Sequence, residues 1–180
     1  MLATVALFLS FECGHLRLPC SIFVLQLSAR YSMKHQYEFP RPAVAVDLVV
    51  FNKTAGNLQS LLLILRKNEP FADCWALPGG FLDENETLEQ AASRELMEET
   101  GVACGELMQL GAWSETERDP RTRVISFAFL AQLVTEQNPI AADDAKEARW
   151  FPIDELPKLA FDHDEMIERA IATIRRPFII

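Results

Sequence analysis

The stretch from Gly80 to Val102 constrains this chain most strongly, and it reads GFLDENETLEQAASRELMEETGV. It begins with a glycine, carries an acid at Glu86 six residues later and ends in a dense acidic run. Within that run, Glu95, Glu98 and Glu99 are spaced at i, i+3 and i+4, which places them on one side of a helix. Like charges held this close repel one another, so the spacing indicates a cation between them. A hard divalent ion with oxygen ligands is the natural candidate.

The same stretch contains the signals of a helix from about residue 88 to residue 100. Thr87 followed by Gln90 is a capping-box pattern, and Gly101 stands where a glycine that ends a helix belongs. These signals predict both ends of the helix.

Two acidic residues of this helix share its apolar side. At 100° per residue, Glu95 and Glu99 fall on the side of Leu88, Ala91 and Ala92. The alanines leave room beside the acids for another element or a ligand. Carboxylates in such a position need partners, and a metal ion meets that need better than a single arginine does.

The fixed positions of this stretch follow the pattern G-x5-E-x7-R-E-U-x-E-E-x-G-U, in which U is an aliphatic residue, and every position is matched. On these residues the sequence resembles the Nudix hydrolase family. A solvated acidic helix face is the ordinary explanation of a charge cluster, but the complete spacing argues against it. The resemblance implies an α+β fold, an α/β/α sandwich with a mixed β-sheet between helices.

The resemblance also implies a set of metal-binding residues. Glu95 and Glu99 would bind the ion directly, Glu98 would be a further ligand or a partner of the ligands, and the carbonyl of Gly79 would face the ion. Glu98 and Glu99 are also the catalytic candidates within the motif. Mg²⁺ is the expected ion because all the ligands are hard oxygens, and Mn²⁺ is expected to substitute for it.

Other positions of the motif are expected to shape it rather than to react. Arg94 is expected to bridge to Glu86 and so to tie the preceding loop to the helix. The structural positions of the motif are Gly80, Glu86, Arg94 and Gly101.

The sequence leaves the general base open, because in this family it is either a motif glutamate or an acid on a later loop. Asp143, Asp144 and Glu147 precede the last expected strand, and Glu115 and Glu117 follow Trp113. Each of these acids is also compatible with a solvated loop position. Asp144 and Glu147 are the preferred candidates.

The substrate prediction depends on residues outside the motif. The family cleaves a nucleoside diphosphate linked to another group, and the loop ETERDPRTR supplies Arg118, Arg121 and Arg123. With LPGGF before the helix and LAFDHDE near the C-terminus, this loop resembles the ADP-ribose branch of the family. The resemblance implies hydrolysis of ADP-ribose to AMP and ribose 5-phosphate, with the arginines binding the substrate. A charge-rich surface turn is the alternative for the loop, and His163 is expected to be satisfied by its neighbours.

Two other functions remain open. One is hydrolysis of an oxidised nucleoside triphosphate or of another nucleotide sugar. The other is a binding domain that senses a nucleotide sugar without cleaving it, as in regulators of the related branch. The complete set of motif carboxylates favours an enzyme. The resemblance also allows a homodimer that completes the substrate pocket.

Composition narrows the partners of the chain. With 180 residues, 49% of them hydrophobic, it is long enough for one domain with a sizeable core. The net charge of −9 argues against a nucleic-acid partner. The four cysteines (Cys13, Cys20, Cys74 and Cys104) show no metal-binding spacing, which is typical of free thiols in a reducing, cytoplasmic compartment.

The N-terminal segment is a separate question. Residues 1–35 form an apolar extension ahead of a Nudix domain at 36–180, and charged residues and a proline interrupt it too often for a membrane span. An upstream or disordered extension, a targeting segment and a packed addition all remain open.

Runs of β-formers and apolar periodicity predict the order of the remaining elements. Strands are expected at residues 43–51, 58–65, 75–80, 107–113, 124–134 and 149–152, and a second helix at 162–174. Strands without regular βαβ alternation favour a layered α+β fold.

Overall fold

A computed structural model describes residues 38–54, 57–135, 137–142 and 144–175 of the chain. The N-terminal extension of residues 1–35, Cys13, Cys20 and the candidate base Asp143 lie outside these described residues. Cys74 and Cys104 are free thiols, as expected. Within the described ranges, no helix is both long enough and apolar enough to cross a membrane.

The described chain alternates strands with two α-helices and one short 3-10 helix. In order, the elements are β1 (Ala43–Thr54), β2 (Asn57–Arg66), β3 (Trp75–Ala76), β4 (Gly79–Phe81), α1 (Leu88–Thr100), β5 (Met108–Trp113), β6 (Val124–Leu133), β7 (Ala145–Pro152), η1 (Ile153–Glu155) and α2 (His163–Arg175). Each element expected from the sequence is present. Two details differ, because β7 begins at Ala145 and the glycine segment after Pro78 is a strand rather than a turn.

The strands form one mixed sheet of seven strands with the order β3-β2-β1-β6-β5. β4 pairs with β1 and β7 pairs with β2 outside this path. β1 runs parallel to β6 over ten residue pairs, from Ala43 opposite Val124 to Asn52 opposite Leu133, whereas its pairings with β2 and β4 are antiparallel. β1 is therefore the central strand, and it brings β4 next to the middle of the sheet.

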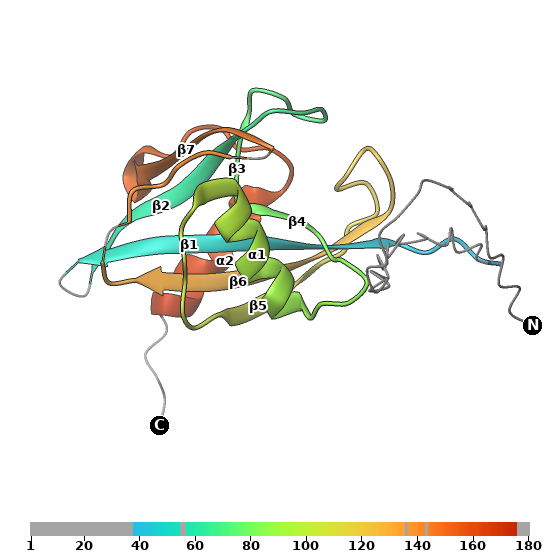
Figure 1. Ribbon diagram of the computed structural model, residues 1–180, viewed down its shortest axis with the longest axis horizontal. Helices are drawn as coiled ribbons and strands as arrows, with labels where there is room; N and C mark the ends of the chain where they lie inside the picture. The colour runs from blue at the N-terminus through green and yellow to red at the C-terminus, as the bar shows by residue number, and fades with distance from the viewer. Residues whose placement is uncertain (1–37, 55–56, 136, 143, 176–180) are drawn as a thin grey trace, which may run out of the picture. The chain divides into compact units, whose positions relative to one another are not determined.

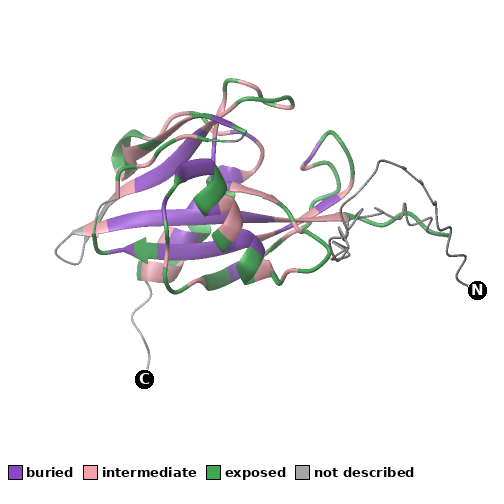
Figure 2. Ribbon diagram, viewed as in Figure 1, coloured by how far each residue is buried: buried purple, intermediate pink, exposed green. Residues whose placement is uncertain are grey.

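Two hydrophobic cores lie on opposite faces of this sheet because side chains alternate along each strand. Val46, Leu48 and Val50 of β1 pack with residues of α1 on one face. Val49 and Phe51 pack with residues of α2 on the other face. Figure 1 shows α1 in front of the sheet and α2 behind it, and Figure 2 shows that the central strands are the most buried part. The α/β/α sandwich with a mixed sheet is confirmed.

The ends of α1 are set by the residues that the sequence indicated. The Thr87 hydroxyl accepts a hydrogen bond from the Gln90 N–H, and the Gln90 side chain accepts one from the Thr87 N–H, which completes the capping box. At the other end, Gly101 adopts φ 65°, a left-handed conformation that favours glycine, and its N–H donates to Met97 O. The capping prediction is confirmed at both ends.

Candidate active site

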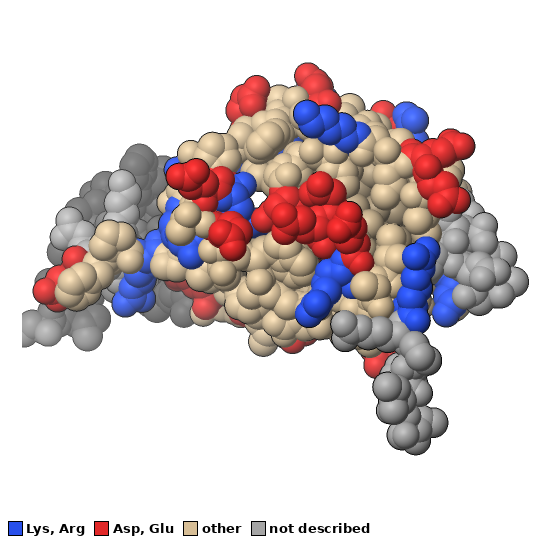
Figure 3. Space-filling model, turned by 180° about the vertical axis from the view of Figure 1, so that it is seen from behind, with Lys and Arg blue, Asp and Glu red and all other residues tan. Residues whose placement is uncertain are grey.

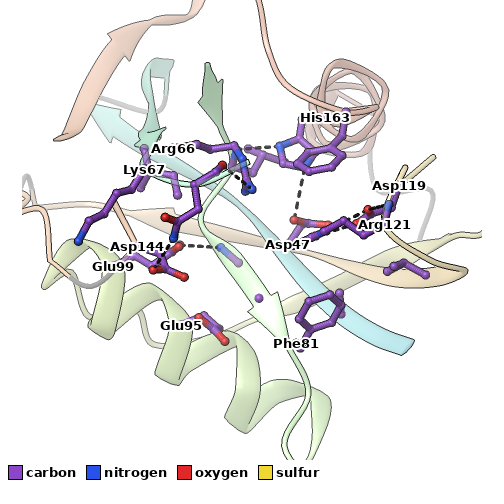
Figure 4. A pocket seen from close by; sticks show the side chains of 18 of the residues that line it. Asp47, Arg66, Lys67, Phe81, Glu95, Glu99, Asp119, Arg121, Asp144 and His163 are labelled. Carbon is purple, nitrogen blue, oxygen red and sulfur yellow. Dashed lines mark hydrogen bonds and ion pairs between the residues drawn. The ribbon is translucent and has the colours of Figure 1, made fainter. Parts of the chain in front are cut away.

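A pocket of about 570 Å³ opens between β4, α1 and the loops that follow β2 and β5. Its wall combines acidic, basic and aromatic side chains (Figure 4). The lining residues are Ala45, Asp47, Ile64, Arg66, Lys67, Asn68, Glu69, Leu77, Gly79, Gly80, Phe81, Asp83, Arg94, Glu95, Glu98, Glu99, Arg118, Asp119, Arg121, Val124, Asp144, Phe161 and His163. All three motif carboxylates of α1 therefore reach one cavity.

Glu99 is the most buried of these carboxylates, with 5% of its surface exposed. Its Oε2 accepts a hydrogen bond of 2.9 Å from the N–H of Gly79. Burial disfavours the charged carboxylate and raises its pKa to about 8, although the Gly79 hydrogen bond acts in the opposite direction. A bound cation would reverse this cost, because it stabilises the ionised form.

Arg94 connects the motif residues to one another. Its guanidinium donates to both carboxylate oxygens of Glu86, at 2.9 and 2.6 Å, and to Phe81 O at 3.1 Å. It also contacts Glu95 at 2.8 Å and Glu98 at 3.0 Å. The hydrogen bonds from Arg94 lower the pKa of Glu86 to about 2. The expected Arg94–Glu86 bridge is present, and it ties the loop before α1 to the helix.

The two glycines of β4 allow the helix acids to approach the sheet. A Cβ on Gly80 would lie 2.3 Å from Oε1 of Glu95, and one on Gly79 would lie 2.2 Å from the carbonyl oxygen of Val46. A side chain at either position would overlap these atoms. Glycine is therefore required where α1, β4 and β1 meet.

The donor chemistry of this pocket wall suits a divalent metal ion. Glu95, Glu98 and Glu99 offer hard carboxylate oxygens, which Mg²⁺ and Mn²⁺ prefer. Burial raises the pKa of Glu95 as well as that of Glu99, so both carboxylates lack full solvation of their charge. In the described part of the chain, however, no three acidic, histidine or cysteine side chains converge closely enough to hold an ion. Arg94 contacts two of the three glutamates and keeps them in ion pairs.

The later-loop acids separate into two groups. Asp144 lines the pocket, and its Oδ1 accepts a hydrogen bond of 2.9 Å from Asn68 Nδ2. Glu147 forms an ion pair with Arg149 and is absent from the described residues that line the pocket. Glu147 was expected on a loop, but it lies in β7, where it pairs opposite Leu65 of β2. Glu115 and Glu117 are likewise absent from the described lining.

The three arginines of the loop before β6 occupy different positions. Arg118 lies at the pocket wall, has a side chain that is 5% exposed, and donates to both oxygens of Asp162 at 2.8 and 2.6 Å. Arg121 also lines the pocket. Arg123 instead donates to the carbonyl of Glu115 at 3.0 Å and is not part of the described pocket lining. The loop therefore brings two of its three arginines to the pocket.

Sequence reasoning missed a buried polar group in the pocket wall. Asp47 is 8% exposed, accepts a hydrogen bond from the Ser126 hydroxyl and lies 3.4 Å from Nε2 of His163. Nδ1 of His163 accepts a hydrogen bond of 2.9 Å from Leu77 N–H, and burial lowers the pKa of this histidine. His163 is thus satisfied by its neighbours, as expected. The one available signal for Asp47 was an acid inside the apolar run AVAVDLVVF.

Two further residues of the wall were also missed. Arg66 donates from Nε to Pro70 O at 3.0 Å, and its guanidinium lies 5.0 Å from the ring centroid of Phe161. Asn68 holds Asp144 through its side-chain amide. Arg66 and Asn68 lie at or just after the end of β2, where the sequence shows only a basic pair after an apolar strand.

The mixed sheet between two helices, with a carboxylate-rich pocket at α1, defines a Nudix-type α/β/α domain. A family model described as the NUDIX domain matches residues 41–170. The chain therefore belongs to the Nudix family.

Similar proteins within this family include enzymes and a regulator. An ADP-ribose pyrophosphatase from Methanocaldococcus jannaschii is 44% identical over 156 residues, which cover 82% of this chain and 89% of that protein. An ADPR-responsive transcriptional repressor from Acinetobacter baylyi is 31% identical, over 83% of this chain and 62% of the repressor.

Solved structures agree with this assignment. The NUDIX domain of Shewanella oneidensis NrtR, in complex with ADP ribose, has a TM-score of 0.70 and 32% identity, and the match covers 82% of this chain and 98% of that one. A MutT/nudix family protein from Enterococcus faecalis also has a TM-score of 0.70, with 35% identity over 80% of this chain and 66% of that one.

Proposed function

We propose that this protein hydrolyses the diphosphate bond of ADP-ribose to give AMP and ribose 5-phosphate, with Mg²⁺ as the cofactor and Mn²⁺ as a substitute. The observation that carries this proposal is that Glu95, Glu98 and Glu99 line one pocket together with two arginines of the loop before β6. The 44% identity to an ADP-ribose pyrophosphatase supports the choice of substrate.

In this proposal Glu95, Glu98 and Glu99 hold the divalent ions, with the Gly79 carbonyl beside them. When bound, such ions neutralise phosphoryl oxygens and lower the pKa of a coordinated water. The hydrogen bond from Gly79 N–H orients the Glu99 carboxylate. Arg94 orients Glu95 and Glu98 in the absence of the ion and must release at least part of that contact when the ion binds.

Asp144 is the general base that we favour among the later-loop acids. It lines the pocket, and Asn68 fixes one of its carboxylate oxygens, which leaves the other to take a proton from the attacking water. Glu98 and Glu99 remain the catalytic candidates within the motif. The position of Glu147 in an ion pair with Arg149 argues against it.

Arg118 and Arg121 are the proposed substrate-binding residues. The Arg118 guanidinium donates to both oxygens of Asp162, which fixes its position at the pocket wall. Arg123, the third candidate, would have to leave the Glu115 carbonyl to reach a ligand. We further propose that residues 36–180 are the Nudix domain, that the protein is cytoplasmic, and that a homodimer would complete its pocket.

A nucleotide-sugar sensor is the second candidate, because a transcriptional repressor is 31% identical to this chain. Against a purely sensing role, the chain retains every acid of the motif, and Glu95, Glu98 and Glu99 reach the pocket. An oxidised nucleoside triphosphate or another nucleotide sugar remains the alternative substrate within the enzyme class.

Incubation of the purified protein and Mg²⁺ with ADP-ribose, NADH, 8-oxo-dGTP and UDP-glucose distinguishes these functions. Release of AMP and ribose 5-phosphate from ADP-ribose, at a rate above that from the other three compounds, is expected. Binding of ADP-ribose without turnover of any compound would support the sensor. Turnover of 8-oxo-dGTP with ADP-ribose untouched would overturn the substrate assignment.

A further inference from the structure

An exposed aromatic side chain, Phe81, stands in the wall of the pocket. It is 43% exposed, although it belongs to β4, whose pairing with β1 holds its backbone opposite Ala45. A single exposed aromatic residue is ordinary on a protein surface and is no evidence of a site. Its neighbour Arg121 supplies the second observation.

The guanidinium of Arg121 lies 5.2 Å from the ring centroid of Phe81. It is held there by Asp119, whose two carboxylate oxygens accept hydrogen bonds from Nε at 3.0 Å and from Nη2 at 2.7 Å. Asp119 is itself only 6% exposed, and it also accepts a hydrogen bond from the Arg121 backbone N–H at 2.9 Å. The guanidinium plane is therefore fixed, and its positive charge is already paired with a carboxylate.

The position of this pair relative to the motif is also fixed. Phe81 follows Gly79 by two residues in β4, which corresponds to about 7 Å along a strand. Gly79 contacts Glu99, and the carbonyl of Phe81 accepts a hydrogen bond from Arg94. A diphosphate bound at the motif glutamates would therefore have Phe81 within reach of one of its two substituents. Figure 4 labels Glu95, Phe81 and Arg121 among the side chains that line this pocket.

A second guanidinium–aromatic pair, Arg66 and Phe161, also lines the pocket and serves as a comparison. The ring of Phe161 packs against Phe71, with centroids 4.6 Å apart, and against His163 at 5.3 Å. The ring of Phe161 is therefore already occupied by contacts with other side chains of the protein. Phe81 is more exposed and is the better surface for a ligand.

We propose that Phe81 and the Asp119-paired Arg121 form the platform against which the base of the nucleoside diphosphate substrate stacks. This inference rests on the proposed function and assigns a specificity-determining role within the same pocket. Aromatic rings and guanidinium planes stack on nucleobases through their flat faces. Because Asp119 neutralises Arg121, the pair suits an uncharged base better than a phosphate group.

Titration calorimetry of the full-length protein with each reaction product separately, in the presence of Mg²⁺, tests the platform. AMP carries the base, whereas ribose 5-phosphate does not. Phe81→Ala is expected to weaken AMP binding at least about fivefold and to leave ribose 5-phosphate binding within about twofold of the wild type. Phe81→Trp is expected to restore AMP binding, and Arg121→Lys, which keeps the charge but loses the plane, is expected to weaken it.

Phe39→Ala is the matched control, because Phe39 is 71% exposed and lies outside the described pocket lining. It is expected to bind both products as the wild type does. Unchanged AMP binding by Phe81→Ala would overturn the proposal, and so would an equal loss of both products. Wild-type binding of AMP without any hydrolysis of ADP-ribose would contradict the proposed function but would leave the platform standing.

Discussion

At the scale of single residues, the site depends on how closely α1 approaches β4. Gly80 has no side chain, and this allows the Glu95 carboxylate to lie where a Cβ would otherwise be. Glu99 makes its contact with the same strand through the Gly79 N–H. The carboxylates of Glu95 and Glu99 can therefore approach β4 because this strand carries no side chain at Gly79 and Gly80.

Replacement of Gly80 by alanine is expected to displace Glu95, because the new Cβ would lie 2.3 Å from its Oε1. The end of a glutamate side chain is flexible, so the fold should survive while the proposed metal ligand Glu95 moves. Mg²⁺ titration of activity should show an apparent affinity at least about tenfold weaker, in line with the cost of perturbing metal-site geometry. Gly105→Ala is the control, since nothing lies within 4 Å of the position that a Cβ would take there. Equal effects of the two substitutions would refute this role of Gly80.

The raised pKa of Glu99 predicts that the stability of the metal-free protein depends on pH. Its pKa is about 8 in the folded state against 4.5 for an ordinary glutamate, so the folded state binds the proton more tightly. The resulting stabilisation is complete below pH 4.5 and is lost as the pH rises toward 8. For a shift of this size it amounts to on the order of 5 kcal/mol. Glu99→Gln should remove this dependence.

Urea unfolding in EDTA at pH 5.5 and pH 8.5 measures the effect. The wild type should lose more free energy of unfolding between the two pH values than Glu99→Gln does. Glu168→Gln, at an exposed position of α2, should behave as the wild type. If the free energy of unfolding changes equally with pH in the wild type and in Glu99→Gln, burial does not raise the pKa of Glu99.

At the scale of elements, α1 is the part that the sequence predicted best. Its caps are local, since Thr87 contacts Gln90 and Gly101 contacts Met97, so their signals are short-range in the sequence. The loop before β7 adds a contact that no local pattern indicated. Ile140 N–H donates to Thr100 O at 2.8 Å, which satisfies a carbonyl at the end of the helix.

Removal of the N-cap of α1 should lower the stability of the protein without changing its activity. Thr87→Ala loses the hydroxyl that accepts from Gln90 N–H, and a loss of about 1 kcal/mol in the free energy of unfolding is expected. Chemical denaturation measures this loss, and activity under native conditions should remain close to that of the wild type. Thr173→Ala in the interior of α2 is the control and should be neutral or slightly stabilising. A larger loss for Thr173→Ala than for Thr87→Ala would contradict the role of Thr87 as the cap.

At the scale of the whole molecule, the sheet brings together residues that are distant in the sequence. The motif could be predicted because its spacing is carried by one helix and the strand before it. The positions of Asp47 and Arg66 could not be predicted. The pairing of β1 with β4 places Asp47 at the pocket, and the course of the chain at the end of β2 places Arg66 there. The sequence placed Glu147 on a loop because it does not reveal the pairing between β2 and β7. In the structure Glu147 pairs opposite Leu65, and this pairing extends β7.

The distribution of charge also emerges only at this scale. The net charge of −9 describes the chain as a whole, whereas Figure 3 shows acidic side chains gathered in a block with lysine and arginine side chains beside it. In the pocket, Arg66 and Lys67 stand near the acids, whereas Arg94, Arg118 and Arg121 are each paired with a carboxylate. An acidic protein can therefore present positive groups to an anionic diphosphate at one place.

The central claim is that the pocket lined by Glu95, Glu98 and Glu99 is the site of hydrolysis. The most direct test measures AMP release from ADP-ribose at increasing Mg²⁺ concentration, for the wild type and for Glu99→Gln side by side. The wild-type rate is expected to rise with Mg²⁺, to saturate, and to disappear in EDTA. The Glu99→Gln rate should be lower by about two orders of magnitude or more while the protein remains folded, since the substitution removes a proposed metal ligand. Wild-type rates from Glu99→Gln, or a wild-type rate that does not depend on Mg²⁺, would contradict this assignment.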